Sequence, residues 1–89
     1  MSMLQDLMET YPDEEFLILD GLDSAIIGVE NNSMRLIYSV NGIIECLMEQ
    51  GMDDEEAIEF YDFNIGCLYI GEKTPILCDD LYFDHEISK

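Results

Sequence analysis

Residues 51–63 read GMDDEEAIEFYDF, and they carry the signals of a helix start. Asp53 is the natural N-cap, because its carboxylate can accept a hydrogen bond from a free backbone amide one turn later. Glu56 occupies the acidic position of a capping box. Helical spacing predicts a core-facing side made of Ala57, Ile58, Tyr61 and Ile65. It leaves on the water side the acids Asp54, Glu55, Glu59 and Asp62.

A second helix is predicted immediately before this one. It begins at Asn41 or Gly42 and runs to about Gln50. Gly51 is placed to end it, because glycine accepts the left-handed conformation of a helix C-terminal cap without steric cost. The inward positions of this helix are Ile43, Ile44, Leu47 and Met48. Two helices joined so closely form an angled pair, and a sheet is the surface available to their apolar sides.

The strands of that sheet are expected from β-rich runs. Residues 25–30 and 35–40 flank a turn-forming segment and predict a hairpin. Residues 67–70 and 75–78 could form a second hairpin, with Pro75 near an edge because proline has no amide to donate. Residues 16–19 fit either a short strand or an irregular packed segment.

These elements predict one α+β domain over residues 1–89. We expect a small, mainly antiparallel sheet with the two consecutive helices packed on one face. A short helix from Ser2 to Thr10 precedes the sheet, and the tail from about residue 79 is expected to be irregular. A compact chain of this length has a long dimension of very roughly 30–35 Å.

The composition indicates a folded and strongly acidic protein. Hydrophobic residues make up 48% of the chain, which argues against a disordered acidic tail. The 21 Asp and Glu residues face three Lys and Arg residues, giving a formal net charge of −18. Such a surface is repelled by nucleic acids and anionic membranes, so we expect a basic protein as the partner. The alternative is that the high negative charge has no partner and only keeps the protein soluble, or that it belongs to a proteome adapted to high salt.

The sequence indicates an intracellular protein. No apolar run approaches the roughly 18 residues of a membrane-spanning helix, and the first residues lack the basic region of a secretory signal. The three cysteines, Cys46, Cys67 and Cys78, form no CxxC pair. We therefore expect them to be reduced, buried thiols rather than disulfides or zinc ligands.

Few residues suggest chemistry, so we expect no enzyme activity, cofactor or metal site. His85, the only histidine, lies near the C-terminus between acids and is expected to be solvated. The acids Asp79, Asp80 and Asp84 could attract cations, as could residues 53–56. Neither group follows the pattern of a calcium loop, which alternates oxygen ligands around a central glycine.

The acidic surface is the remaining functional feature, and it is expected to contact a partner. One DNA strand carries a phosphate every 3.4 Å, or about nine over the expected long dimension. A face that held about half of the acids would therefore resemble a phosphate strand to a cationic groove. The contrary possibility is an even spread of charge. The predicted contact residues are Asp53, Asp54, Glu55, Glu59 and Asp62.

Three segments resemble a group of uncharacterised small acidic proteins of bacteriophages and prophages. They are DGLDSAIIGVE, GMDDEEAIEFYDFN and YIGEKTP, and the similarity covers roughly residues 19–76. The resemblance implies a phage origin and a place in the cytoplasm of the infected host cell. It carries over no site residues. Small acidic phage proteins that block restriction, repair or CRISPR enzymes offer a functional analogy.

The leading hypothesis is a phage-encoded inhibitor that mimics nucleic acid. It would bind a basic host protein such as a nuclease or defence enzyme, in the manner of anti-restriction, anti-CRISPR or nuclease-inhibitor proteins. The alternative is a small adaptor or structural protein that uses its apolar strands and methionines, and that could form homo-oligomers. Salt separates the two, because apolar assembly survives salt that screens charge.

Overall fold

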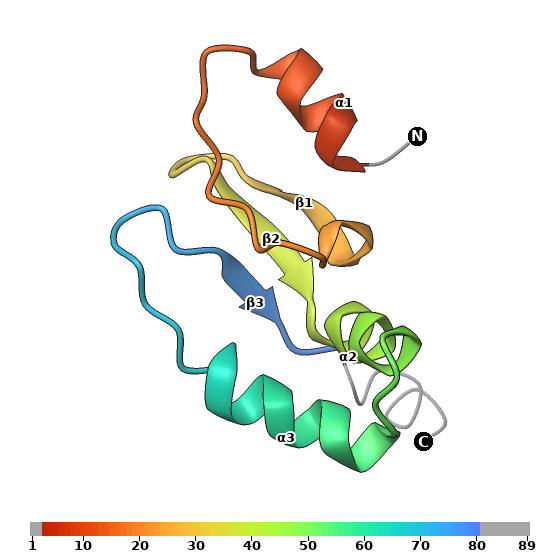
Figure 1. Cartoon of the computed structure of the whole chain (residues 1–89). Helices are drawn as coiled ribbons and strands as arrows, with labels where there is room; N and C mark the ends of the chain where they lie inside the picture. Colours follow the sequence, from red (N-terminus) through yellow and green to blue (C-terminus); the bar gives the residue numbers. More distant parts are fainter. Residues whose placement is uncertain (1–2, 81–89) are drawn as a thin grey trace, which may run out of the picture.

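A mixed three-stranded sheet lies at the centre of residues 3–80, the part of the chain that this computed structural model describes (Figure 1). Strand β1, Ile26–Glu30, pairs antiparallel with β2, Arg35–Ser39. Strand β3, Ile76–Cys78, pairs parallel with β2, which is therefore the middle strand. The hairpin expected from the first two β-rich runs is confirmed.

The second expected hairpin is wrong. Residues 67–70 form no strand, and β3 pairs with β2 instead. The reason is topological. Both helices of the pair lie between β2 and β3 in the chain. This long crossover brings the chain back to the end of the sheet at which β2 begins, so β3 runs parallel to β2. Residues 16–19 also form no strand.

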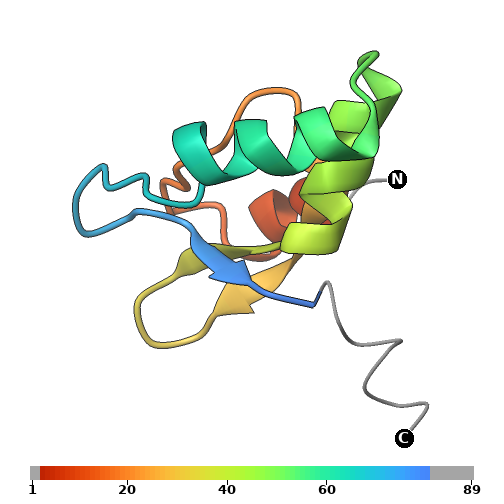
Figure 2. The same ribbon diagram turned by 90° about the horizontal axis from the view of Figure 1, so that it is seen from below.

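The expected helices are confirmed. Helix α1 is Met3–Thr10, a short 3-10 turn η1 is Asp23–Ala25, α2 is Val40–Glu49 and α3 is Asp54–Asn64. Figure 2 shows α2 and α3 on the same side of the sheet. Helix α2 begins earlier than expected because Ser39 is its N-cap, with Oγ accepting a hydrogen bond from the Gly42 amide at 2.9 Å. Gly51 has a φ of +113° where the two helices join.

The core lies between the sheet and α2. Its most deeply buried large side chains are Leu36, Tyr38, Val40 and Ile43. The Tyr38 hydroxyl accepts a hydrogen bond from the Leu19 amide at 2.8 Å, which ties the irregular segment before β1 to the core. Burial raises the pKa of Tyr38, an effect that the Leu19 amide partly offsets. Met48, expected to face inward, is exposed in the last turn of α2, although Ile44 on the same side of the helix is buried.

Asp80 connects the chain after β3 to the start of α2. One carboxylate oxygen accepts from the Ser39 hydroxyl at 2.6 Å, and the other accepts from the Asn41 amide at 2.8 Å. Burial by itself would raise the pKa of Asp80, but these hydrogen bonds outweigh it and lower the pKa below 3.8. Residues 81–89, and with them Asp84 and His85, lie outside the described residues.

Replacing Asp80 by Asn should lower the free energy of unfolding at neutral pH by about 1 kcal/mol, because the charged acceptor of two hydrogen bonds is lost. A carboxyl whose folded pKa is depressed stabilises the fold above its unfolded pKa, and loses that effect as the pH falls through the folded value. Urea unfolding should therefore show a difference at pH 7 that is lost as the pH falls through the lowered pKa of Asp80. Asp13→Asn, at an exposed site, is the matched control. Equal stabilities at pH 7 would contradict the role of Asp80.

Candidate functional site

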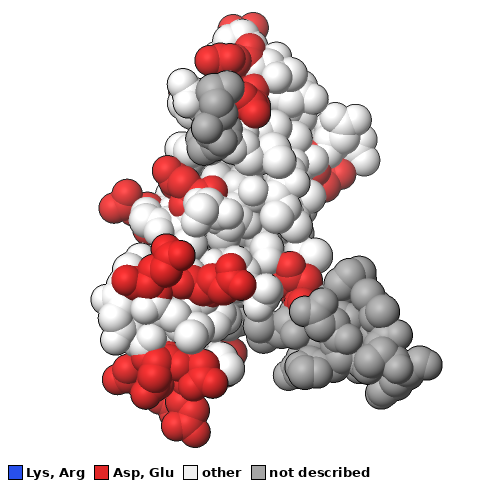
Figure 3. All heavy atoms as spheres, turned by 90° about the vertical axis from the view of Figure 1, so that its right-hand side faces the viewer, with Lys and Arg blue, Asp and Glu red and all other residues white. Residues whose placement is uncertain are grey.

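The exposed acids of α2 and α3 gather around the point where the two helices join. On the side of the molecule drawn in Figure 3, the carboxylates form several separate groups with uncharged surface between them, and the lowest groups lie over this joint. No described Lys or Arg appears on that side. The exposed acids of the two helices and their joint are Glu45, Glu49, Asp53, Asp54, Glu55, Glu56, Glu59 and Asp62.

Three of these acids hold the start of α3. The Asp53 carboxylate accepts from the Glu56 amide at 2.8 Å, and the Glu56 carboxylate accepts from the Asp53 amide at 3.1 Å. These two contacts confirm the predicted capping box. The Asp54 carboxylate accepts from the Glu55 amide at 2.8 Å. Asp53 and Asp54, both predicted partner contacts, therefore also serve the fold.

The other three predicted contact residues share one outward side of α3. Glu55, Glu59 and Asp62 are exposed and stand at positions i, i+4 and i+7 of the helix. We call these three residues the α3 acidic face. The carboxylates of Glu55 and Glu59 accept no hydrogen bond from any residue between 3 and 80. They are consequently available to a partner.

Burial and two nearby acids, one of them Asp62 of the α3 acidic face, act on Tyr61. The pKa of Tyr61 is raised, first by burial and then by the negative charges of Asp79 and Asp62. Tyr61 packs against the core, so its ring anchors the inner side of α3 while its hydroxyl stays neutral.

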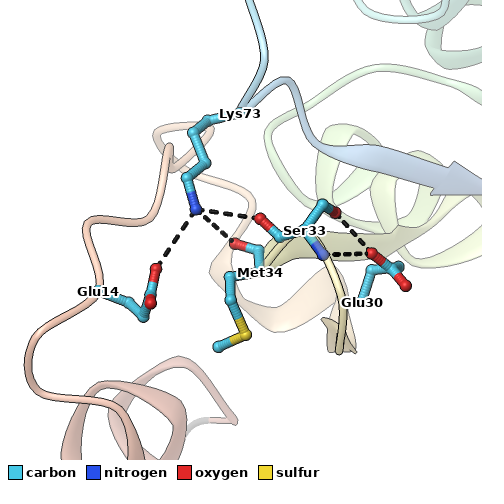
Figure 4. A network of polar contacts seen from close by, with 5 residues as sticks. All are labelled: Glu14, Glu30, Ser33, Met34 and Lys73. Carbon is cyan, nitrogen blue, oxygen red and sulfur yellow. Dashed lines mark hydrogen bonds and ion pairs between the residues drawn. The ribbon is translucent and has the colours of Figure 1, made fainter.

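Lys73, in the loop before β3, connects that loop to the β1–β2 turn and to the segment that contains Glu14 (Figure 4). Its ammonium group donates to the Ser33 carbonyl at 3.1 Å and to the Met34 carbonyl at 3.4 Å, and it pairs with the Glu14 carboxylate at 3.3 Å. In the same turn the Glu30 carboxylate accepts from the Ser33 hydroxyl and amide, and these bonds lower the pKa of Glu30.

The second described cation is also engaged in this region. Arg35, at the start of β2, donates from Nε to the Thr74 carbonyl at 2.6 Å. Figures 1 and 2 both place the β1–β2 turn and the loop before β3 at the opposite end of the molecule from the α2–α3 joint. Arg35 and Lys73 are the Lys and Arg residues of the described chain, so no described cation neutralises the acids at the joint.

A third side of α3 is aromatic, and sequence reasoning missed it. Phe60 is 40% exposed and Phe63 is 79% exposed. Together with Met52, Glu56 and Glu59 they line a shallow cleft of about 330 Å³. The signal was present in the sequence, because Phe60, Tyr61 and Phe63 cannot all face the core at helical spacing.

The buried side of α3 is narrower than predicted. Ala57 and Ile65 are buried as expected, but Ile58 is 42% exposed. Helix α3 packs chiefly against α2 rather than on the sheet. A helix that rests on one neighbour buries a narrow stripe, and this arrangement leaves Ile58 outside it.

The expectation of three buried thiols is wrong for two cysteines. Cys46 is buried, with Sγ 3.0 Å from the Ser24 hydroxyl, whereas Cys67 and Cys78 are exposed. Cys67 follows the end of α3 in a turn, and Cys78 ends an edge strand, so neither position is covered. All three are free thiols. Asp80 uses both carboxylate oxygens to hold the start of α2. Among residues 3–80, no group of three or more His, Cys, Asp or Glu side chains is placed to hold a metal ion.

Comparisons with known proteins give no family assignment: the chain matches no protein-family model, curated protein or solved structure. Among the described residues, no helix combines the length and apolar character needed to cross a membrane.

The capping role of Asp53 can be separated from its charge. Asp53→Ala should lower the free energy of unfolding by about 1 kcal/mol, because the Glu56 amide loses its acceptor. Asp53→Asn should retain most of that stability, since asparagine is an equally good N-cap. Urea unfolding followed by circular dichroism measures both. Equal losses in the two variants would show that the charge, not the hydrogen bond, is what stabilises α3.

Proposed function

We propose that this chain is a non-catalytic acidic inhibitor that binds a basic, nucleic-acid-binding protein of an infected host cell. The target class is a nuclease or a restriction, CRISPR or other defence enzyme. One observation carries the proposal: the α3 acidic face is exposed and its carboxylates have no hydrogen-bond or ion-pair partner among residues 3–80, while both described cations are engaged at the other end of the molecule.

The spacing of the α3 acidic face suits a groove that binds phosphates. A helix rises 1.5 Å per residue, so Glu55 and Glu59 lie about 6 Å apart along the axis and Glu59 and Asp62 about 4.5 Å apart. One DNA strand carries a charge every 3.4 Å. Three carboxylates on α3 therefore present a charge density of the same order as a single strand, over a span of about three phosphates.

The separate acidic groups in Figure 3 favour this local form of mimicry over imitation of a whole strand. The described chain measures 38 × 30 × 26 Å, so its long dimension exceeds the span of the α3 acidic face several-fold. The remaining acids would then steer a cationic partner towards the molecule by long-range attraction.

The resemblance to small acidic phage proteins supports the proposed setting. A protein made during infection meets nucleases and defence enzymes in the host cytoplasm, and their DNA or RNA channels are basic. No catalytic step is part of this role, which needs binding alone.

A second candidate function has its own support. The exposed Phe60 and Phe63 side chains favour an adaptor or a homo-oligomer that assembles through apolar contacts. Sedimentation at low and high salt distinguishes the candidates, because apolar assembly persists at high salt while charge mimicry weakens.

The inhibitor proposal is tested by mixing the protein with purified restriction, CRISPR and other DNA-cleaving enzymes and following cleavage of labelled DNA. The chain should inhibit at least one enzyme, with inhibition that decreases as salt rises. The triple variant Glu55→Gln/Glu59→Gln/Asp62→Asn should weaken inhibition about tenfold or more, because the proposed contacts lose their charge.

The matched control removes the same charge elsewhere. Glu9→Gln/Asp13→Asn/Glu15→Gln changes three exposed acids near α1 and should inhibit nearly as well as the unaltered chain. Equal effects of the two triple variants would contradict a site on α3. Absence of inhibition and of salt-sensitive binding to every enzyme would overturn the proposed function.

A further inference from the structure

Two clefts lie on either side of the ridge that Phe60 and Asn64 form on α3. The first, the acidic cleft, is the shallow one of about 330 Å³ whose further walls include Met52, Glu56, Glu59 and Phe63. The second, the apolar cleft, is about 280 Å³ and has a floor of Leu22, Leu47 and Ile65. Because Phe60 and Asn64 line both clefts, the two are neighbours on one surface.

The acidic cleft combines aromatic surface with negative charge. The rings of Phe60 and Phe63 can cover the methylene stem of a long side chain. The cationic head of that side chain would then contact the carboxylate of Glu59 and Oε2 of Glu56, the oxygen that does not take part in the capping box. A guanidinium above a phenyl ring gains a further cation–π attraction. Arg or Lys therefore fits this cleft, with Arg favoured for its planar head.

The apolar cleft has a different chemistry. Leu22, Leu47 and Ile65 belong to the buried core, and Leu68 and Phe60 extend the apolar wall towards the surface. Asp20, Gln50 and Asn64 are the polar residues that line it, and they add a negative charge beside the apolar surface. An aliphatic side chain of a partner can fill such a space and remove both surfaces from water.

Charge argues against a second copy of this chain as the occupant. A symmetric dimer through this surface would bring Glu56 and Glu59 of one protomer close to the same residues of the other, without a described cation nearby. Like charges held together across an interface oppose association. A partner with positive charge beside its apolar side chains meets no such opposition.

We infer that the two clefts beside Phe60 receive a basic amphipathic segment of the partner protein. An Arg or Lys of that segment occupies the acidic cleft, and an aliphatic side chain one helical turn away occupies the apolar cleft. The inference rests on the proposed function, because it identifies how the basic partner is recognised. Charge attracts the partner to α3. The two clefts beside Phe60 then favour those basic proteins that also offer an aliphatic side chain.

The test uses synthetic peptides of about 16 residues, long enough to form a helix on binding. The first carries Arg and Leu one helical turn apart, and the second has every Leu replaced by Ser at the same net charge. Calorimetry with the full chain should show binding of the first peptide and at least about tenfold weaker binding of the second. Phe63→Ser should weaken binding of the first peptide about tenfold and also weaken the residual binding of the second, because both peptides place an Arg stem against this ring in the acidic cleft.

Ile27→Thr is the control, because Ile27 is a similarly exposed apolar residue on β1 rather than on α3. It should leave both affinities unchanged. The peptide comparison requires no change in the protein, so it decides the question even if Phe63→Ser folds poorly.

Three results would overturn the inference. If both peptides bind equally well, Phe63→Ser has no effect and the triple variant of the α3 acidic face weakens both, charge alone recognises the partner and the proposed function stands. If neither peptide binds and the triple variant also leaves enzyme inhibition unchanged, both proposals fail. If the chain forms a salt-resistant dimer that Phe63→Ser dissociates, the surface serves self-association.

Discussion

Repulsion among carboxylates is the constraint under which this fold forms. Twenty-one acids face three basic residues in an 89-residue chain, so the acids repel one another with few cations to offset the repulsion. Apolar burial must outweigh this repulsion. The core between the sheet and α2 supplies that burial, with Tyr38, Leu36 and Ile43 almost completely removed from water.

The fold also uses its few cations and several of its acids as structural ties. Lys73 and Arg35 hold the loops at one end of the sheet. At the other end, carboxylates stabilise the helix starts: Asp80 holds α2, and Asp53 caps α3, where the positive end of the helix dipole attracts them. Glu59 and Asp62 lie outside the first turn of α3 and have no such role. The separation of the α3 acidic face from both described cations supports the proposed binding of a basic partner.

Local signals predicted much of the fold. The capping box at Asp53, the glycine joint at Gly51 and the hairpin of β1 and β2 depend on neighbouring residues, so sequence spacing reveals them. The parallel pairing of β3 and the hydrogen bonds of Asp80 depend on chain segments about 40 residues apart, which spacing cannot reveal. Prediction of the site was similarly divided. The outward acids of α3 were found. Helical spacing also implies that some of the aromatic residues of α3 face outward, but which ones do so depends on how α3 packs against α2.

The central claim is that Glu59 and Asp62 of the α3 acidic face serve the proposed binding of a partner and lower the stability of the helix. Asp62 lies in the last turn of α3, at the negative end of the helix dipole, and that turn holds no basic residue. Glu59 follows Glu55 by four residues, so their like charges repel each other. The most direct measurement is the free energy of unfolding of Glu59→Gln/Asp62→Asn in urea at low and high salt. The account predicts a variant that is more stable than the unaltered chain at low salt, with a difference that shrinks as salt screens the charges. A variant that is less stable at low salt would show that these acids serve the fold itself, and would contradict the account.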